Sequence, residues 1–187
     1  MVVSFTDIED KFDRVFGFIQ RDLERTLTLD PGGDFAVPGL ATCACETLAR
    51  YRCGSSEGAE VFLRLLPDGP FRVIGKSVYD ILRNGLVHRY DTADIRIEGK
   101  TIRLAISWRA EPHLSVKDIE GLPNLVLNVT TLCADLFGAF DEYRKELIGS
   151  AEARDRFFKT YRDTGTVDVR VPGQVAAWKE IVKNAFT

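Results

Sequence analysis

Residues 79–90 read Tyr79-Asp80-Ile81-Leu82-Arg83-Asn84-Gly85-Leu86-Val87-His88-Arg89-Tyr90, an apolar helical run that holds three chemically versatile side chains. Arg83 is a permanent cation whose planar fork fits phosphate. His88 is one of only two histidines in the chain, and its ordinary pKa near neutrality lets it give or take a proton. Asn84 adds a side-chain amide next to the cation. The segment therefore predicts a helix with a candidate phosphate-directed acid–base site of Arg83, Asn84 and His88.

The spacing of these side chains restricts how they could act together. Each residue of an α-helix advances by about 100°, so Asn84 and His88 share a face, whereas Arg83 and His88 diverge by about 140°. A bend at Asn84-Gly85, or a second copy of the chain across an interface, would bring the pair together. A structural interpretation is also open: Arg83 pairs with Asp80, Asn84 hydrogen-bonds locally, and His88 lies near the helix end, where its charge favours the helix dipole.

Helical periodicity dominates the chain before this segment. Apolar residues recur at helical spacing over residues 8–23, and a loop rich in Pro and Gly follows at 30–34. A second helix is expected over about 38–54, and a short one over about 57–66. The next helix runs into residues 79–90 and is expected to end around Arg89 to Asp91.

After this helix, the pattern of apolar residues changes from helical to alternating. A two-residue turn at Gly99-Lys100 would pair Ile97 with Ile102 and Ile95 with Leu104, and it would place the apolar side chains on one face. We therefore expect a β-hairpin at about residues 94–107 that packs on the helices, because a lone hairpin is marginal in water. Candidates for a third strand are Val167, Val169 and Val171.

The C-terminal half again shows helical spacing. The longest helix is expected over about 125–147, another over about 150–162, and a strand and helix in an extension at about 166–187. These patterns predict a mainly α chain with one domain spanning residues 1–187, built as a bundle of about five main helices with a small β-hairpin appendage.

The charge of the chain limits the function classes that it fits. The net charge is −3, and basic residues are interleaved with Asp and Glu. Such a chain has no global basic field, which counts against high-affinity, non-specific binding of nucleic acid. It also lacks an apolar run long enough to cross a membrane, and its N-terminus does not resemble a secretory signal. We therefore expect a cytoplasmic protein with no membrane contact.

Neither a metal nor a cofactor is expected. The cysteines Cys43, Cys45, Cys53 and Cys133 lack the paired spacing of zinc ligands, so we expect them to be reduced and mainly structural. His113 lies in a loop-like segment without ligand-spaced partners. The chain contains no Gly-rich phosphate loop, zinc-protease motif or nucleophile elbow.

The segment Arg83-Asn84-Gly85-Leu86-Val87-His88 resembles the signature of HEPN domains (higher eukaryotes and prokaryotes nucleotide-binding). In that signature an Arg, often followed by a polar residue, precedes a His by a few residues within a helical bundle. The wider stretch 78–90 is similar to a branch of uncharacterised bacterial HEPN-like proteins. In that branch a helix like Cys45-Glu46-Thr47-Leu48 precedes the motif and is followed by a short helix like Phe62-Leu63-Arg64-Leu65-Leu66-Pro67. The resemblance covers roughly residues 35–143 and implies an HEPN-like helical bundle.

Many HEPN domains are metal-independent endoribonucleases in which two protomers pair so that Arg and His of both copies line one cleft. The resemblance implies that His88 would serve in acid–base chemistry at the RNA 2′-hydroxyl and the leaving oxygen. Arg83 would stabilise charge on the phosphorane-like transition state, and Asn84 would orient the phosphate or the catalytic pair. The products would carry a 2′,3′-cyclic phosphate. Such enzymes often act as toxins or in phage defence.

Other HEPN-like proteins are non-catalytic and bind nucleotides or protein partners. Because the chain is acidic, we favour a non-catalytic nucleotide-binding, partner-binding or assembly module over the dimeric ribonuclease, and an unrelated helical protein is the third alternative. The resemblance implies a homodimer. It also implies RNA or a nucleotide as candidate ligand, and a protein such as an antitoxin as candidate partner.

Overall fold

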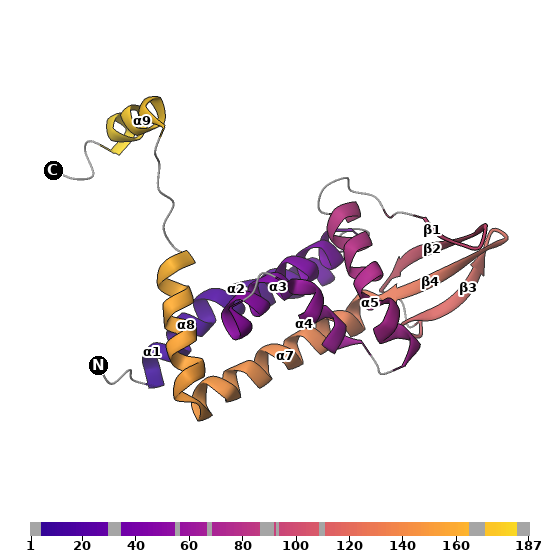
Figure 1. The fold of residues 1–187 in the computed structure, drawn as a ribbon, viewed down its shortest axis with the longest axis horizontal. Helices are drawn as coiled ribbons and strands as arrows, with labels where there is room; N and C mark the ends of the chain where they lie inside the picture. Colours follow the sequence, from indigo (N-terminus) through magenta and orange to yellow (C-terminus); the bar gives the residue numbers. More distant parts are fainter. Residues whose placement is uncertain are drawn as a thin grey trace.

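The computed structural model describes residues 5–29, 35–54, 57–66, 69–86, 92, 94–108, 111–164 and 171–182 of the 187. The described chain is mainly helical, as predicted, with a small mixed sheet at one end of the helices (Figure 1). The helical elements are α1 (Phe5–Phe12), η1 (Asp13–Gly17), α2 (Phe18–Leu27), α3 (Ala36–Cys53), α4 (Gly58–Leu65), α5 (Pro70–Ile81), η2 (Leu82–Leu86), α7 (Val129–Gly149), α8 (Ala151–Thr164) and α9 (Pro172–Val182). The strands are β1 (Ile95–Ile97), β2 (Lys100–Ser107), β3 (Ser115–Ile119) and β4 (Leu122–Asn128).

Helix α3 is the central element of the bundle. It packs against α2, α4, η2, α7 and α8, so several of its sides are covered. Close helix packing on several sides requires small side chains at the contacts. The buried small residues of α3 are Gly39, Ala41, Thr42, Ala44, Cys45 and Ala49. The predicted helix over about 38–54 is therefore confirmed, and it begins slightly earlier, at Ala36.

A cluster of aromatic rings joins four of the helical elements. Phe16 of η1 lies 5.0 Å from Phe140 of α7 and 5.6 Å from Tyr51 of α3, measured between ring centroids. Tyr51 in turn lies 5.2 Å from Phe157 of α8. The buried hydroxyl of Tyr143 donates a hydrogen bond to the backbone carbonyl of Tyr51 at 2.8 Å, so its polar end is satisfied inside the core.

The predicted hairpin is confirmed as β1 and β2, but its register differs from the prediction. Ile95 pairs with Ile102 and Ile97 pairs with Lys100, so the turn is Glu98-Gly99. Both turn residues have positive φ, 50° and 78°, as a type I′ turn requires. Glycine takes the second turn position, and the turn shifts by one residue relative to the predicted Gly99-Lys100. Each residue of β1 therefore pairs with a residue two positions away from its predicted partner. Because side chains alternate between the two faces of a strand, the apolar side chains remain on the same face as predicted.

Among the described residues the sheet has four strands in the order β1-β2-β4-β3, and the strands added to the hairpin come from residues 115–128. β3 and β4 form a second antiparallel hairpin, and β4 runs parallel to β2. Of the residues predicted for a third strand, Val171 lies in no strand, and Val167 and Val169 lie outside the described residues. In the predicted C-terminal extension, the structure describes a helix, α9.

The predicted start of the longest helix near Leu125 is wrong. Leu125, Val126 and Leu127 belong to the central strand β4, and α7 begins only at Val129. All three side chains are buried, so the strand reads as a continuous apolar run with no alternation. Such a run is difficult to distinguish from the first turn of a buried helix by its periodicity.

The junction between β4 and α7 is fixed by Asn128 and His113. The Asn128 side chain caps α7 by accepting a hydrogen bond from the Thr131 backbone N–H at 3.0 Å, and its amide donates to the carbonyl of Glu111 at 2.9 Å. The backbone N–H of Asn128 donates to Nδ1 of His113 at 3.1 Å. His113, from the segment between β2 and β3, is thus held in the tautomer with its proton on Nε2. Nε2 itself is buried, and no described residue accepts a hydrogen bond from it.

None of the helices within the described ranges combines the length and the apolar character needed to span a membrane.

We expect the free energy of unfolding to fall as the pH is lowered from about 7.5 to about 5.5. Burial lowers the pKa of His113, so the folded protein resists protonation, while the unfolded chain binds a proton near the ordinary value of 6.5. The unfolded state therefore binds more protons, and acid favours it. Protonated Nδ1 could also no longer accept from Asn128. The measurement is the melting temperature across this pH range.

His113→Asn is the matched control for this prediction. Its Oδ1 can accept the same hydrogen bond but does not titrate, so the variant should lose part of the acid sensitivity of the wild type. Burial raises the pKa of the neighbouring Asp135, which works in the opposite direction in acid, but both proteins carry it. Equal pH profiles for the two proteins would contradict the assignment to His113.

Candidate functional site

The predicted motif begins in a short π-helical turn, η2, that continues directly from α5. Arg83 and Asn84 lie in η2, and Gly85 of the same turn is buried. η2 packs against α3. A π-helical turn replaces the i→i+4 hydrogen bonds of an α-helix with i→i+5 bonds, and such turns occur frequently at functional sites. A bend at Asn84-Gly85 was one of two arrangements considered for bringing Arg83 and His88 together, and the π turn includes these two residues.

Arg83 forms an ion pair with Glu46 of α3. Nε of Arg83 lies 2.6 Å from Oε1 of Glu46, and the side chains are only 25% and 33% exposed. The hydroxyl of Tyr79 on α5 donates to the same Oε1 at 3.0 Å. One carboxylate oxygen thus joins three elements, α3, α5 and η2. The alternative partner considered for Arg83, Asp80, instead pairs with Lys76 at 3.1 Å.

The pKa values of the groups around Glu46 are raised by contact with Glu46, by burial, or by both. The hydrogen bond to Glu46 raises the pKa of Arg83. Burial, followed by the hydrogen bond to Glu46, raises the pKa of the Tyr79 hydroxyl well above its ordinary range. Burial also raises the pKa of the neighbouring Cys43 thiol, although the positive charge of Arg83 opposes this shift. Around neutral pH Arg83 is therefore charged, and Tyr79 and Cys43 are neutral.

Gly58, at the start of α4, allows α4 to approach Glu46 and Tyr79 closely. A Cβ atom at residue 58 would lie 2.5 Å from the Tyr79 hydroxyl and 2.7 Å from the backbone nitrogen of Glu46. No side chain fits at that distance, so the beginning of α4 can approach α3 and α5 only through glycine. The carboxylate of Glu46 is therefore enclosed by α4 as well as by its two hydrogen-bond donors.

The structure places two of the three predicted site residues. Arg83 is half-buried and paired, whereas Asn84 is exposed and its side chain forms no hydrogen bond with another described residue. His88 lies outside the described residues, so its position relative to Arg83 stays a prediction. The sequence reasoning did not identify Tyr79 and Glu46 as partners of Arg83. The sequence feature that could have pointed to Glu46 was the segment Cys45-Glu46-Thr47-Leu48, which is part of the resemblance to HEPN domains.

The cysteines and the groups that could bind a metal ion are the other candidate side chains singled out in the sequence. The four cysteines are free, with Cys45 and Cys133 buried, and burial raises the pKa of the Cys133 thiol to about 12. No group of three or more His, Cys, Asp and Glu side chains in the described ranges is arranged to hold a metal ion.

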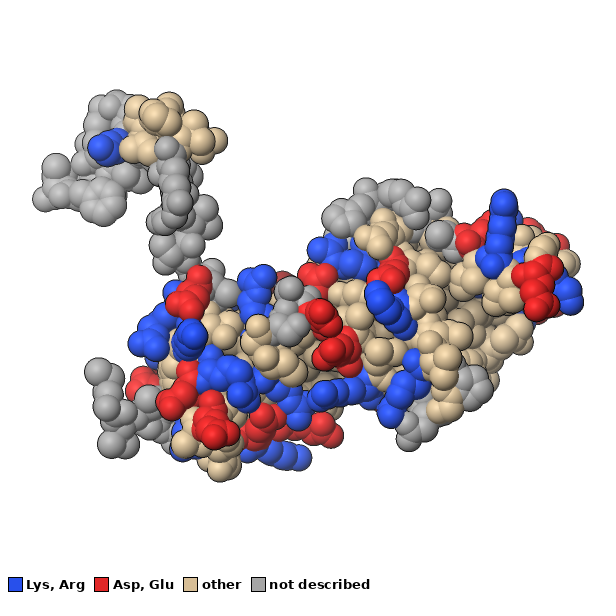
Figure 2. Space-filling model, viewed as in Figure 1, with Lys and Arg blue, Asp and Glu red and all other residues tan. Residues whose placement is uncertain are grey.

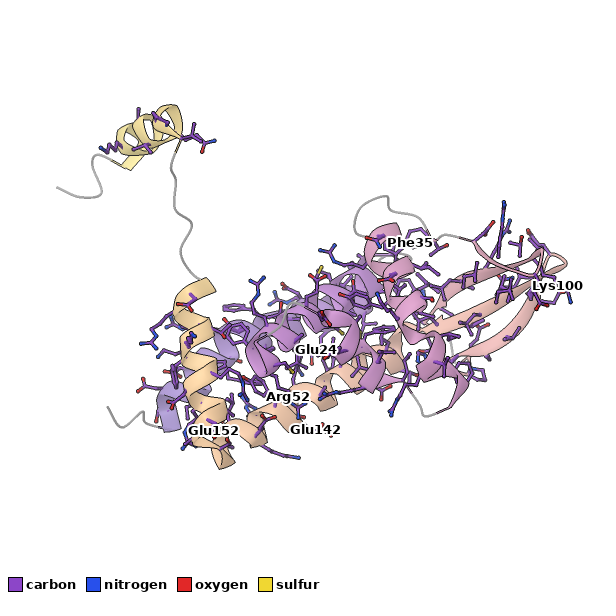
Figure 3. The ribbon with its side chains drawn as sticks, viewed as in Figure 1. Glu24, Phe35, Arg52, Lys100, Glu142 and Glu152 are labelled. Carbon is purple, nitrogen blue, oxygen red and sulfur yellow. The ribbon has the colours of Figure 1, made fainter. Side chains whose placement is uncertain are left out.

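A cavity of about 310 Å³ lies on the opposite side of α3 from Glu46, between α3, α4 and α7. It has a mixed lining of apolar and charged side chains, among them Arg52 and Glu142, which lie close together in Figure 3. Arg52 forms an ion pair with Glu146, with 2.8 Å between Nε of Arg52 and Oε2 of Glu146. Arg83 and Asn84 do not line this cavity.

Comparison of the chain with protein-family models, with curated proteins and with solved structures gives no match.

Replacing Glu46 should destabilise the fold. We expect Glu46→Gln to lower the free energy of unfolding by about 1 kcal/mol and Glu46→Ala by about 2 kcal/mol, because the alanine leaves Arg83 and Tyr79 without their shared acceptor. Urea denaturation measures both values.

Asp80→Asn is the control for this prediction. It removes a carboxylate from an exposed pair with Lys76, and we expect a change below about 0.5 kcal/mol. A loss for Glu46→Gln no larger than for Asp80→Asn would show that the interaction of Glu46 with Arg83 contributes little to stability.

Proposed function

We propose that this protein is an HEPN-like, non-catalytic binding or assembly module that acts as a homodimer. The observation that carries the proposal is the contact of Arg83 with Glu46 at 2.6 Å. Instead of facing an open cleft, the guanidinium of the motif is bound to a carboxylate of the neighbouring helix. In this proposal the motif arginine stabilises the bundle, and binding takes place on the surface beside it.

Electrostatics support a structural role for Arg83. A phosphate that approached Arg83 would meet the negative charge of Glu46 within hydrogen-bond distance of the same guanidinium. Because the pair is half-buried, the repulsion would be screened less than at an open surface. The phosphate would have to displace Glu46 or share Arg83 with it. Displacement would also remove the acceptor of the Tyr79 hydroxyl.

The exposed side of α5 and η2 supports an assembly role. Val73 is 84% exposed and Ile74 is 39% exposed, which is unusual for large apolar side chains on a helix that is otherwise well packed. Lys76, Asp80 and Asn84 continue this side toward the motif. Lys76 and Asp80 form an ion pair at 3.1 Å, and the exposed Arg72, one turn before Lys76, adds a second cation to this side. A two-fold interface pairs a patch with itself, and a patch with both charges suits such pairing.

The ribonuclease is the second candidate, and the π turn favours it. In this candidate the π-helical geometry of η2 would continue to His88, which would then lie closer to the side of Arg83 than on a regular α-helix. Asn84 is exposed beside Arg83. In this candidate His88 would be the acid–base group, and substrate binding would separate Arg83 from Glu46.

The two candidates predict different behaviour toward RNA. Our proposal expects the wild type to leave labelled single-stranded and hairpin RNAs intact in EDTA. The measurement is gel analysis of the RNA, with the 3′ ends tested for a 2′,3′-cyclic phosphate.

His88→Ala and His113→Asn make a matched pair for this assay, because each removes one of the two histidines. EDTA-resistant cleavage that disappears in folded His88→Ala but persists in His113→Asn would overturn the proposal and establish the ribonuclease.

Assembly is tested separately by the mass in solution. We expect the wild type to sediment as a dimer, and Val73→Glu to sediment as a monomer with an unchanged melting temperature, since Val73 is too exposed to support the core. Val116→Glu is the control, because Val116 is 67% exposed but lies on β3. A monomeric wild type, or equal behaviour of the two variants, would contradict this interface.

A further inference from the structure

A basic pocket lies where the end of α3 meets α8. It has a volume of about 500 Å³ and is lined by Arg50, Gly54, Arg156, Lys159, Thr160 and Asp163. Arg50 and Gly54 are one turn apart at the end of α3, and the four residues of α8 follow the spacing of one helix face. In Figure 2, Lys and Arg side chains gather over α8 and extend along the neighbouring part of the bundle.

The lining of this pocket is mainly positive, whereas the chain as a whole carries a net negative charge. Three cations face one carboxylate, Asp163, in a protein whose net charge is −3. Arg50 and Lys159 are exposed, and neither forms an ion pair with another residue in the described part of the chain. A concave site with an excess of one charge concentrates ligands of the opposite sign.

Arg156 lies near a carboxylate that it shares with Arg52. Oε1 of Glu146 lies 3.6 Å from its Nη2, while Oε2 of the same carboxylate lies 2.8 Å from Nε of Arg52. One carboxylate thus serves two guanidinium groups, and the closer contact is with Arg52. The Arg156 side chain is 39% exposed and lines the pocket, and its contact with Glu146 is a charge contact longer than a hydrogen bond.

We propose that this pocket binds a small molecule carrying a diphosphate group, with Arg50 and Lys159 as its principal contacts and Arg156 as a third cation. Arginine offers phosphate a planar fork, and lysine offers it a compact charge. The volume suits a ligand such as a nucleoside diphosphate, and the excess of cations requires a ligand with more than one negative charge. The site contains neither Arg83 nor Asn84, so the proposal is independent of the function assigned to the motif.

Calorimetric titration of the full chain with inorganic pyrophosphate and with ADP tests the proposal. Arg50→Gln combined with Lys159→Gln should weaken binding of both probes at least about tenfold, because the loss of even one charged contact is worth about that factor. Asp163→Asn should tighten binding about twofold by removing the opposing charge. Binding should also weaken as salt is raised.

Arg25→Gln combined with Lys145→Gln is the matched control. It removes the same charge from exposed positions of α2 and α7 that do not line the pocket, and it should leave binding of both probes unchanged. Equal weakening by the two double variants would overturn the proposal, since it would indicate only non-specific attraction. Absence of binding by the folded wild type would also overturn it. Binding of a single-stranded oligoribonucleotide without binding of pyrophosphate or ADP would replace it with an RNA surface.

Discussion

The burial of α3 on several sides is the constraint on which the rest of the structure depends. A helix that contacts α2, α4, α7, α8 and η2 cannot carry large side chains at every contact, and the buried positions of α3 are accordingly rich in Ala, Gly, Thr and Cys. Large rings from the neighbouring elements fill the space beside its C-terminal half, where Phe16 and Phe157 pack against Tyr51 and Phe140 packs against Phe16. Small residues on the central helix thus leave space that aromatic residues of the neighbouring helices fill.

One side of α3 carries polar side chains that contact two different parts of the bundle. Cys43, Glu46, Arg50 and Gly54 follow one another at helical spacing, so they share a side of the helix. The first two face Arg83, and the last two line the basic pocket beside α8. Glu46 neutralises the arginine of the sequence motif, whereas Arg50 meets further cations. The part of α3 that lies beside the predicted phosphate-directed motif is thus the less suitable of the two for binding an anion.

The sheet is attached to the bundle through a short and well-defined junction. β4 ends at Asn128 and α7 begins at the next residue, so the direction of the strand fixes where the longest helix starts. Asn128 caps that helix and bonds the segment before β3, and His113 accepts from the Asn128 backbone. Both hairpins close with the same Glu-Gly pair in the left-handed region, at Glu98-Gly99 and Glu120-Gly121. The Ile-Glu-Gly sequence that precedes each second strand was a signal for the second hairpin.

The sequence by itself determined the mainly helical class, the approximate extent of α3 and α8, and the first hairpin, because these follow from the local repeat of apolar residues. The tertiary structure decided that Leu125 to Leu127 form a central strand, since a strand buried on both faces has no alternation. It decided that Arg83 pairs with Glu46 rather than with the nearby Asp80, and that Arg50 of α3 and Lys159 of α8 line one pocket. Those contacts join residues far apart in the chain, and their formation depends on how the helices pack.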